Sequence, residues 1–269
     1  VFPDDSGIGR IIGRGAEWDA GLRPIIDLLV PGGAPLICEV GSNIGASVMQ
    51  IFAARPSAAV VCFEPSDRFR PFLEANLELA GYPATKVIPL LAGQTTGSMT
   101  LYNTETTASV VAEWRDDHPL PRAQQARMTT LDDVFVRCRR LDFLKIDADG
   151  FDFEVLRGGE TILRRDRPVI YFELSPQLLS SPPQDDLAWL QTLGYPTFIC
   201  FFPMGGGKGV SADVDEVTRW CADASHCDVL ACPAGSEVEA RALAIDWRGS
   251  VSEIAPRVAQ ALARDGGET

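Results

Sequence analysis

Short apolar runs recur along the chain and alternate with amphipathic stretches. Runs of the kind that form strands buried on both faces of a parallel sheet lie at residues 35–40, 58–64, 86–91, 141–147 and 168–174. This alternation of strand and helix predicts a doubly wound α/β fold with a mostly parallel sheet. In such a fold the ligand crevice lies at the carboxyl ends of the strands.

One amphipathic stretch shows how the helices are expected to begin and end. Residues 66–81 place Phe69, Leu73 and Leu77 at helical spacing. Ser66 is a candidate N-cap, and Gly81 is a candidate stop. We therefore expect a helix between the second and third strands.

Two regions depart from this alternation. Residues 92–127 are polar with one or two short strand-like runs, which indicates a lid or a substrate loop. Residues 196–202 and 228–232 are two more strand candidates, joined by a glycine-rich segment and a short helical pattern. They bring the expected sheet to seven strands. A last helix is expected over residues 251–263, packed on the sheet or on a partner.

The pattern divides the chain into three expected parts. Residues 1–35 form a helical lead-in, residues 36–235 the main domain with the polar insertion at 92–127, and residues 236–269 a helical extension. The 269 residues are 46% hydrophobic and 23% charged, which suits a globular protein with one sizeable core.

Composition and charge narrow the expected surroundings and partners. No run approaches the ~20 apolar residues of a membrane span, and the first residues lack the features of a signal peptide, so we expect no membrane span and a cytoplasmic location. The net charge of -13 argues against a nucleic-acid partner. The seven cysteines form no CxxC pair and are expected to be reduced. A zinc site on Cys221, His226, Cys227 and Cys232 is disfavoured, because the spacing fits no familiar ligand pattern.

A glycine loop follows the first strand and indicates a nucleotide-type cofactor. The loop reads EVGSNIG over residues 39–45, with two glycines four apart. It lacks the third glycine of the GxGxxG dinucleotide fingerprint and the Lys-Ser or Lys-Thr of a P-loop. The later glycine-rich segment fails the P-loop test too.

Two acidic residues at strand ends suggest which cofactor this is. Glu64 ends the second strand, where a carboxylate can accept hydrogen bonds from both hydroxyls of a ribose. Glu39 lies beside the loop, where it would repel a phosphate but suit an ammonium or a sulfonium. S-adenosylmethionine has a ribose and both cations, and no phosphate. In the alternative interpretation, Glu39 caps the following helix and Glu64 is a surface charge.

The motifs resemble one family in their order. EVGSNIG, VCFEP, TTLDDVF, LDFLKIDADGFDFEVLRGGE and RPVIYFEL are similar to successive motifs of the FkbM family of S-adenosylmethionine-dependent methyltransferases, over about residues 16–235. The resemblance implies a class I, Rossmann-like methyltransferase fold. It also implies O-methylation of a hydroxyl on a small-molecule natural product or a saccharide.

The resemblance also implies roles for individual residues. The loop of Glu39, Gly41, Ser42, Asn43 and Gly45 would surround the methionyl part of the cofactor. Glu64 would hold the ribose, and Asp147, at the end of the fourth strand, would face the transfer site. Asp149 and Asp152 stand where the family more often has glutamates, which leaves their roles open.

An alcohol acceptor must lose a proton, so a general base is expected. Asp147 is one candidate; the histidines, His118 and His226, narrow the remaining choice. His118 precedes Pro119 in a polar segment, where an exposed loop residue is the alternative. A magnesium ion on Asp147 and Asp149 could orient the hydroxyl, but the sequence does not require one.

Two other classes of protein share these features. An NAD-dependent oxidoreductase would have a similar fold, and a non-catalytic module would bind the cofactor without turnover. No motif in the sequence indicates which acceptor is methylated or how many chains associate.

Overall fold

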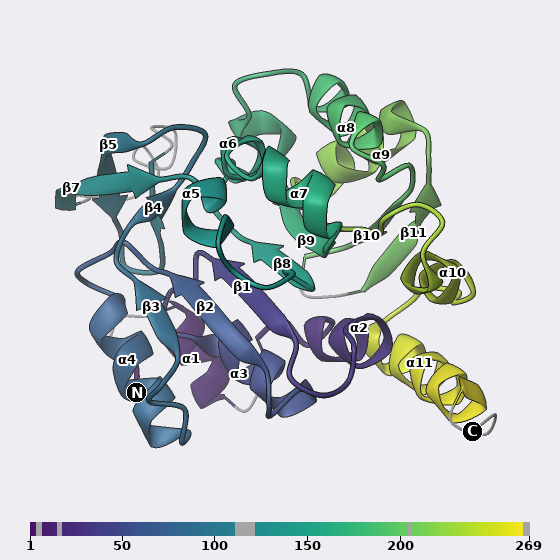
Figure 1. Cartoon of the computed structure of the whole chain (residues 1–269), viewed down its shortest axis with the longest axis horizontal. Helices are drawn as coiled ribbons and strands as arrows, with labels where there is room; N and C mark the ends of the chain where they lie inside the picture. The colour runs from purple at the N-terminus through teal and green to yellow at the C-terminus, as the bar shows by residue number, and fades with distance from the viewer. Residues whose placement is uncertain (4–6, 15–17, 111–121, 204–205, 266–269) are drawn as a thin grey trace.

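The computed structural model describes residues 1–3, 7–14, 18–110, 122–203 and 206–265. A central twisted sheet runs through this part of the chain, with helices on both sides (Figure 1). No helix in these ranges has both the length and the apolar character needed to span a membrane.

The central sheet has eight strands in the order β11-β10-β12-β9-β8-β1-β2-β3. Their bounds are β1 Leu36–Val40, β2 Ala59–Phe63, β3 Lys86–Ile88, β8 Phe143–Ile146, β9 Val169–Leu174, β10 Phe198–Phe201, β11 Gly207–Ser211 and β12 Cys227–Ala231. Strands β3, β2, β1, β8 and β9 are parallel, whereas β12 runs antiparallel to both of its neighbours. The predicted doubly wound, mostly parallel α/β fold is confirmed. The seven expected strands are joined by an eighth, β11.

Side chains alternate between two apolar clusters on the faces of the sheet. Cys38 and Val40 of β1 lie in one cluster, and Ile37 lies in the other. The first cluster is covered by helices α5 Leu131–Phe135, α6 Asp152–Arg157, α7 Glu160–Asp166, α8 Pro183–Thr192 and α9 Val214–Asp223. The second is covered by α2 Leu22–Leu29, α3 Ala46–Ala54, α4 Arg70–Leu79, α10 Glu237–Leu243 and α11 Val251–Asp265.

Helix α11 contacts α2 and inserts Ile254 and Val258 into the second cluster. Ile254 also lies against Gly207 of β11, so the helix packs both on α2 and on the edge of the sheet. The division into residues 1–35, 36–235 and 236–269 stays a prediction. The first of these parts contains α1 Gly7–Gly13 as well as α2.

The polar insertion differs from the expectation of one or two short strands. A second sheet has the order β4-β7-β5-β6, with β4 Leu91–Ala92, β5 Gly97–Asn103, β6 Ala108–Ser109 and β7 Arg122–Thr129. The run at 86–91 also splits between the two sheets, because Pro89 cannot donate to a strand ladder. The described part of the insertion thus belongs to a small sheet that lies beside the central sheet (Figure 1).

Two other element predictions were wrong in detail. Helix α4 begins at Arg70, and the Ser66 Oγ accepts the backbone N–H groups of Arg68 and Phe69 in the turn before it. Gly81 has φ +86° and ends the helix as predicted. The glycine-rich segment was expected only to join two strands, but its described part includes the edge strand β11, which pairs antiparallel with β10.

Candidate functional site

The glycine loop links the end of β1 to α3 and touches the end of β8. Gly41 has φ +83°, and a Cβ there would lie 1.9 Å from the carbonyl oxygen of Asp147. The Asp147 N–H in turn donates to the carbonyl of Val40 at 3.0 Å. Asn43 and Gly45 also have positive φ angles, of 48° and 86°. Because Gly41 lacks a side chain, the loop and the end of β8 can meet.

The backbone N–H groups of this loop are used inside the protein. Those of Gly41 and Ser42 donate to the carbonyl of Phe63 at 3.1 and 3.2 Å. The Asn43 N–H donates to Glu64 Oε2 at 2.6 Å, and the Gly45 N–H donates to the Ser42 carbonyl at 2.7 Å. A loop that grips phosphate needs N–H groups directed at the ligand. This loop is therefore poorly suited to the pyrophosphate of a dinucleotide.

Glu64 is buried at the end of β2, with 4% of its surface exposed. Its Oε1 accepts the Ser66 N–H at 2.8 Å. Burial raises the pKa of the Glu64 carboxyl to about 7 against the effect of the two backbone donors, Ser66 and Asn43. The alternative of a surface charge is wrong. Each oxygen keeps a second lone pair that a ligand hydroxyl can use.

Glu39 is fully buried on β1. Its Oε1 accepts a hydrogen bond from the Ser47 hydroxyl in α3, and its Oε2 has no hydrogen-bond partner. The N-cap of α3 is Gly45, without a side-chain cap, so the helix-capping alternative for Glu39 is wrong. The unpartnered oxygen of Glu39 fits a site for a cation or a hydrogen-bond donor.

Lys145 forms the centre of an ion cluster under the loop. It pairs with Glu39 across neighbouring strands, and its Nζ lies 3.7 Å from Glu39 Oε1, 3.3 Å from Asp147 Oδ2 and 3.5 Å from Asp19 Oδ2. Burial lowers the pKa of Lys145, but the charges of Asp147, Asp19 and Glu39 outweigh it and hold the pKa above its ordinary value. The ammonium thus stays charged and holds the three carboxylates together.

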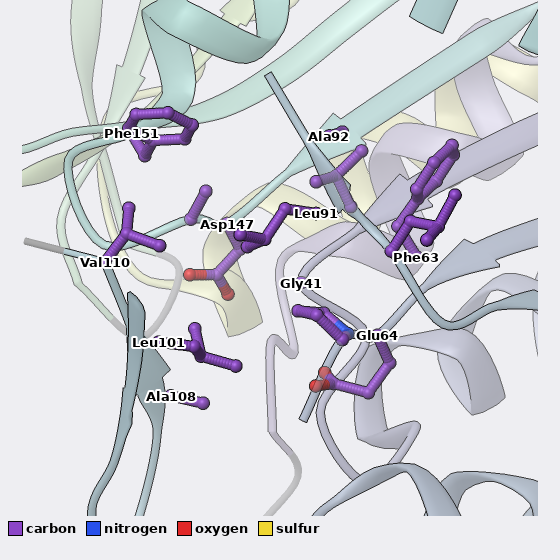
Figure 2. A pocket seen from close by; sticks show the side chains of 14 residues that line it. Gly41, Phe63, Glu64, Leu91, Ala92, Leu101, Ala108, Val110, Asp147 and Phe151 are labelled. Atoms are coloured by element: carbon purple, nitrogen blue, oxygen red, sulfur yellow. The ribbon is translucent and has the colours of Figure 1, made fainter. Parts of the chain in front are cut away.

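A small apolar pocket of about 50 Å³ opens beside the loop. Figure 2 shows the carboxyl groups of Glu64 and Asp147 at this pocket, with Leu101 and Ala108 of the second sheet facing Phe63 across it. Leu90, Leu91 and Phe151 complete much of the apolar lining. The second sheet therefore supplies one wall of the pocket.

A larger cavity of about 590 Å³ shares Gly41, Glu64 and Asp147 with the small pocket. It extends along the strand ends to β9 and β12, and its carboxylate lining consists of Asp19, Glu64, Asp147, Asp149, Glu173 and Asp228. Among the described residues that line either cavity, none is Lys or Arg. Such a lining attracts cations and repels phosphate.

The structure brings most of the predicted site residues together. Gly41, Ser42, Asn43, Glu64 and Asp147 line the large cavity. Glu39 lies directly beneath it, joined to Ser47 of the lining. Gly45 begins α3 behind the loop. His118 lies outside the described residues.

Five residues of the site were not predicted from the sequence to belong to it: Asp19, Lys145, Glu173, Ser175 and Asp228. Register explains their position: Lys145 pairs with Glu39, and Glu173 pairs with Asp228. Because β12 is antiparallel, its first residues lie at the same edge as the carboxyl ends of the parallel strands. One signal was readable: Lys145 and Glu173 are charged residues inside otherwise apolar strands.

The two acidic residues after Asp147 are held by the protein. Asp149 has φ +49°, and its Oδ2 accepts the Thr107 hydroxyl at 2.7 Å. Asp152 is buried and accepts the Glu173 N–H at 3.3 Å. Burial raises the pKa of both carboxyls. Within the described ranges, no group of three or more His, Cys, Asp or Glu side chains is placed to hold a metal, at Asp147 or at the four disfavoured zinc candidates.

Comparisons with known proteins agree with this geometry. The model of the methyltransferase FkbM domain matches residues 39–197, more than half of the chain. No curated protein matches the chain. Among solved structures, a methyltransferase FkbM from Methylobacillus flagellatus KT is similar with a TM-score of 0.50 and 14% identity, over 76% of this chain and 45% of that one.

The present chain thus spans less than half of that solved protein. An O-methyltransferase from Bacillus cereus in complex with SAH has a TM-score of 0.42 and 14% identity, over 80% of each chain. The fold is that of the class I methyltransferases. The matched domain model and the site at the strand ends show that the chain belongs to the FkbM methyltransferase family.

Proposed function

We propose that the protein is an S-adenosylmethionine-dependent methyltransferase that methylates a hydroxyl of a small molecule. The observation that carries this proposal is the loop at residues 41–45, where the N–H groups of Gly41, Ser42, Asn43 and Gly45 are occupied within the protein. The described residues that line the two cavities include six carboxylates and no Lys or Arg. The site therefore suits a cofactor that is cationic and has no phosphate. The same observations count against an NAD-dependent oxidoreductase.

The residues present fit this cofactor in three places. The small pocket between Phe63, Leu91 and Leu101 suits the flat apolar face of an adenine. Glu64 lies at its rim and has lone pairs for the ribose hydroxyls. The unpartnered Oε2 of Glu39 suits the methionyl ammonium. When bound, the cofactor supplies an electrophilic methyl group.

The remaining part of the large cavity is the proposed acceptor site. Asp147 borders both cavities, so it can contact the acceptor beside the cofactor. Its Oδ2 is fixed by Lys145, which leaves Oδ1 to orient an acceptor hydroxyl. Alignment of the acceptor with the methyl group is a large source of acceleration in such transfers. The whole cavity, of about 590 Å³, has to hold part of the cofactor together with the acceptor, which suits a small-molecule natural product or a saccharide unit.

Methyl transfer to defined alcohols tests this proposal. The protein is incubated with unlabelled S-adenosylmethionine and a panel of methyl glycosides, amino sugars and phenols, and the products are analysed by mass spectrometry. We expect a 14 Da increase on one class, located on oxygen. Methylation only on nitrogen or carbon would contradict O-methylation. Tight cofactor binding without transfer to any acceptor would support the non-catalytic module instead.

A further inference from the structure

A chain of polar contacts lines the large cavity where β9 and β12 meet. The Ser175 hydroxyl donates to Glu173 Oε1 at 2.5 Å. Glu173 Oε2 faces His226 Nε2 at 4.0 Å, and His226 Nδ1 lies 3.2 Å from the Ser225 hydroxyl. All four residues line the cavity. Glu173 is the residue before the last of β9 and His226 directly precedes β12, so two neighbouring strands place them.

Ser225 occupies a backbone position that favours glycine. It follows the end of α9 with φ +72°. A side chain in the left-handed region is disfavoured there, and glycine is the residue usually found just after a helix. The serine at this position contacts the imidazole through its hydroxyl, which glycine could not do. Ser225 thus combines an unfavourable backbone angle with a hydrogen-bond contact to His226. Such strained residues are often found at functional sites.

The separation between His226 and Glu173 leaves room for a ligand group. At 4.0 Å, Nε2 and Oε2 are too far apart for a direct hydrogen bond. An acceptor hydroxyl beside this gap could donate to Nε2. The carboxylate of Glu173 would then stabilise the imidazolium that forms. Ser175 fixes the other carboxylate oxygen, so Glu173 cannot turn away easily.

We propose that His226 is the general base of the transfer, and that Glu173 and Ser225 are positioning residues for its imidazole. This inference rests on the proposed function. The acceptor oxygen forms a bond to the methyl carbon while its proton moves to His226 Nε2. The bond from that carbon to the cofactor sulfur breaks, and its electron pair stays on sulfur. The proton then leaves from the imidazolium to solvent.

The tautomer follows from this assignment. Nδ1 must carry the proton and donate it to the Ser225 hydroxyl, so that Nε2 keeps a free lone pair on the cavity side. Burial lowers the pKa of His226, with an opposing effect from Asp147, so the imidazole is neutral near pH 7. The titratable groups around it are Glu173 on β9, Asp147 after β8 and Asp228 on β12. Asp147 is then left to orient the hydroxyl.

Nuclear magnetic resonance of the free protein tests the assignment without any acceptor. The sequence has two histidines, so the imidazole signals of His226 are identified by their loss in His226→Gln. At pH 8 we expect nitrogen shifts of the Nδ1–H tautomer, and in a titration a pKa below about 6.5. Ser225→Gly should reduce the Nδ1–H fraction while the fold stays intact. A dominant Nε2–H tautomer in the wild type would overturn the proposal.

Methyl transfer to the acceptor found in the panel gives a second, independent result. His226→Gln should lower turnover about 10²-fold with unchanged affinity for S-adenosylhomocysteine. Glu173→Gln should move the acid limb of the pH profile to lower pH, because the imidazolium loses its stabilising charge. A His226→Gln enzyme within 3-fold of wild type would overturn the proposal. Absence of cofactor binding in the wild type would instead reject the proposed function and leave the tautomer result standing.

Discussion

Glu64 is held at the end of β2 by two backbone donors, Asn43 and Ser66. Glu64→Ala should weaken binding of S-adenosylhomocysteine about 30- to 150-fold, since a charge-assisted contact to the ribose contributes on the order of 2–3 kcal/mol. It should also lower Tm, because two buried N–H groups lose their acceptor. Glu64→Gln should fall between the two. Calorimetry and thermal melts measure both effects.

The exposed Glu74 on α4 gives the matched control. Glu74→Ala should leave both affinity and Tm near the wild-type values. Wild-type affinity in a folded Glu64→Ala protein would refute the ribose assignment.

Asp147 is a second residue to test, and its substitution should affect turnover more than cofactor binding. Asp147→Asn should lower turnover roughly 10²-fold with little change in cofactor affinity, because the amide no longer accepts from the acceptor hydroxyl with a full charge. The exposed Asp185 at the start of α8 provides the control Asp185→Asn. Near-normal turnover of Asp147→Asn would exclude a role in orienting or deprotonating the acceptor.

A chelator distinguishes the metal alternative at the same residue. Lys145 already neutralises Asp147, so we expect turnover to be unchanged by a chelator. Loss of turnover that added magnesium restores would instead place a metal on Asp147 and Asp149.

Some residues of the site could be predicted from the sequence, and others could not. Glu39, Glu64 and Asp147 were readable, because each follows or ends an apolar run at the edge where parallel strands end. Glu173 and His226 were not readable as neighbours, because their proximity depends on β12 pairing with β9 in reverse. Such pairing over long separations leaves no local pattern.

The glycine loop and the end of β8 meet at Gly41 and Asp147. Gly41→Ala should lower Tm strongly and abolish cofactor binding, because its Cβ would overlap the Asp147 carbonyl and force the two elements apart. Gly81→Ala is the matched control: its φ is +86° but its Cβ would meet nothing within 4 Å. The control should show only the cost of the backbone angle, about 1 kcal/mol. Equal effects of the two changes would contradict a tight junction.

Helices and strands could be predicted from the sequence where the local pattern of apolar residues determines them. The buried parallel strands read as continuous apolar runs, and β1, β2, β8 and β9 lie within one or two residues of their predicted positions. Strand β11 was missed, because glycines weaken a strand pattern and here pairing with β10 decides the conformation. The second sheet was missed for a related reason: β5 and β7 pair across a long polar segment.

At the scale of the whole molecule, the buried carboxylates predict how stability depends on pH. Burial raises the pKa of Glu64 and Glu173 from 4.5 to about 7. The folded protein therefore keeps protons that the unfolded chain has released, so the free energy of unfolding should fall as pH rises from about 4.5 to 7. Each group corresponds to about 3 kcal/mol at the upper end. Denaturant unfolding between pH 4.5 and 8 measures the trend.

The double variant Glu64→Gln with Glu173→Gln should weaken this dependence, because neither amide titrates, while Asp149 and Asp152 keep their raised pKa values and their share of it. Stability of the wild type that rises with pH across the same window would show that these carboxyls are ionised in the folded protein.

The cavities at the strand ends are proposed to hold a cationic, phosphate-free cofactor. Titration calorimetry of the protein with S-adenosylhomocysteine, S-adenosylmethionine and NAD tests this proposal. We expect saturable binding of both S-adenosyl compounds at one site per chain, and no heat with NAD, because the loop has no free N–H groups at Gly41, Ser42, Asn43 and Gly45 for a pyrophosphate. Saturable binding of NAD, with no heat from either S-adenosyl compound, would contradict it.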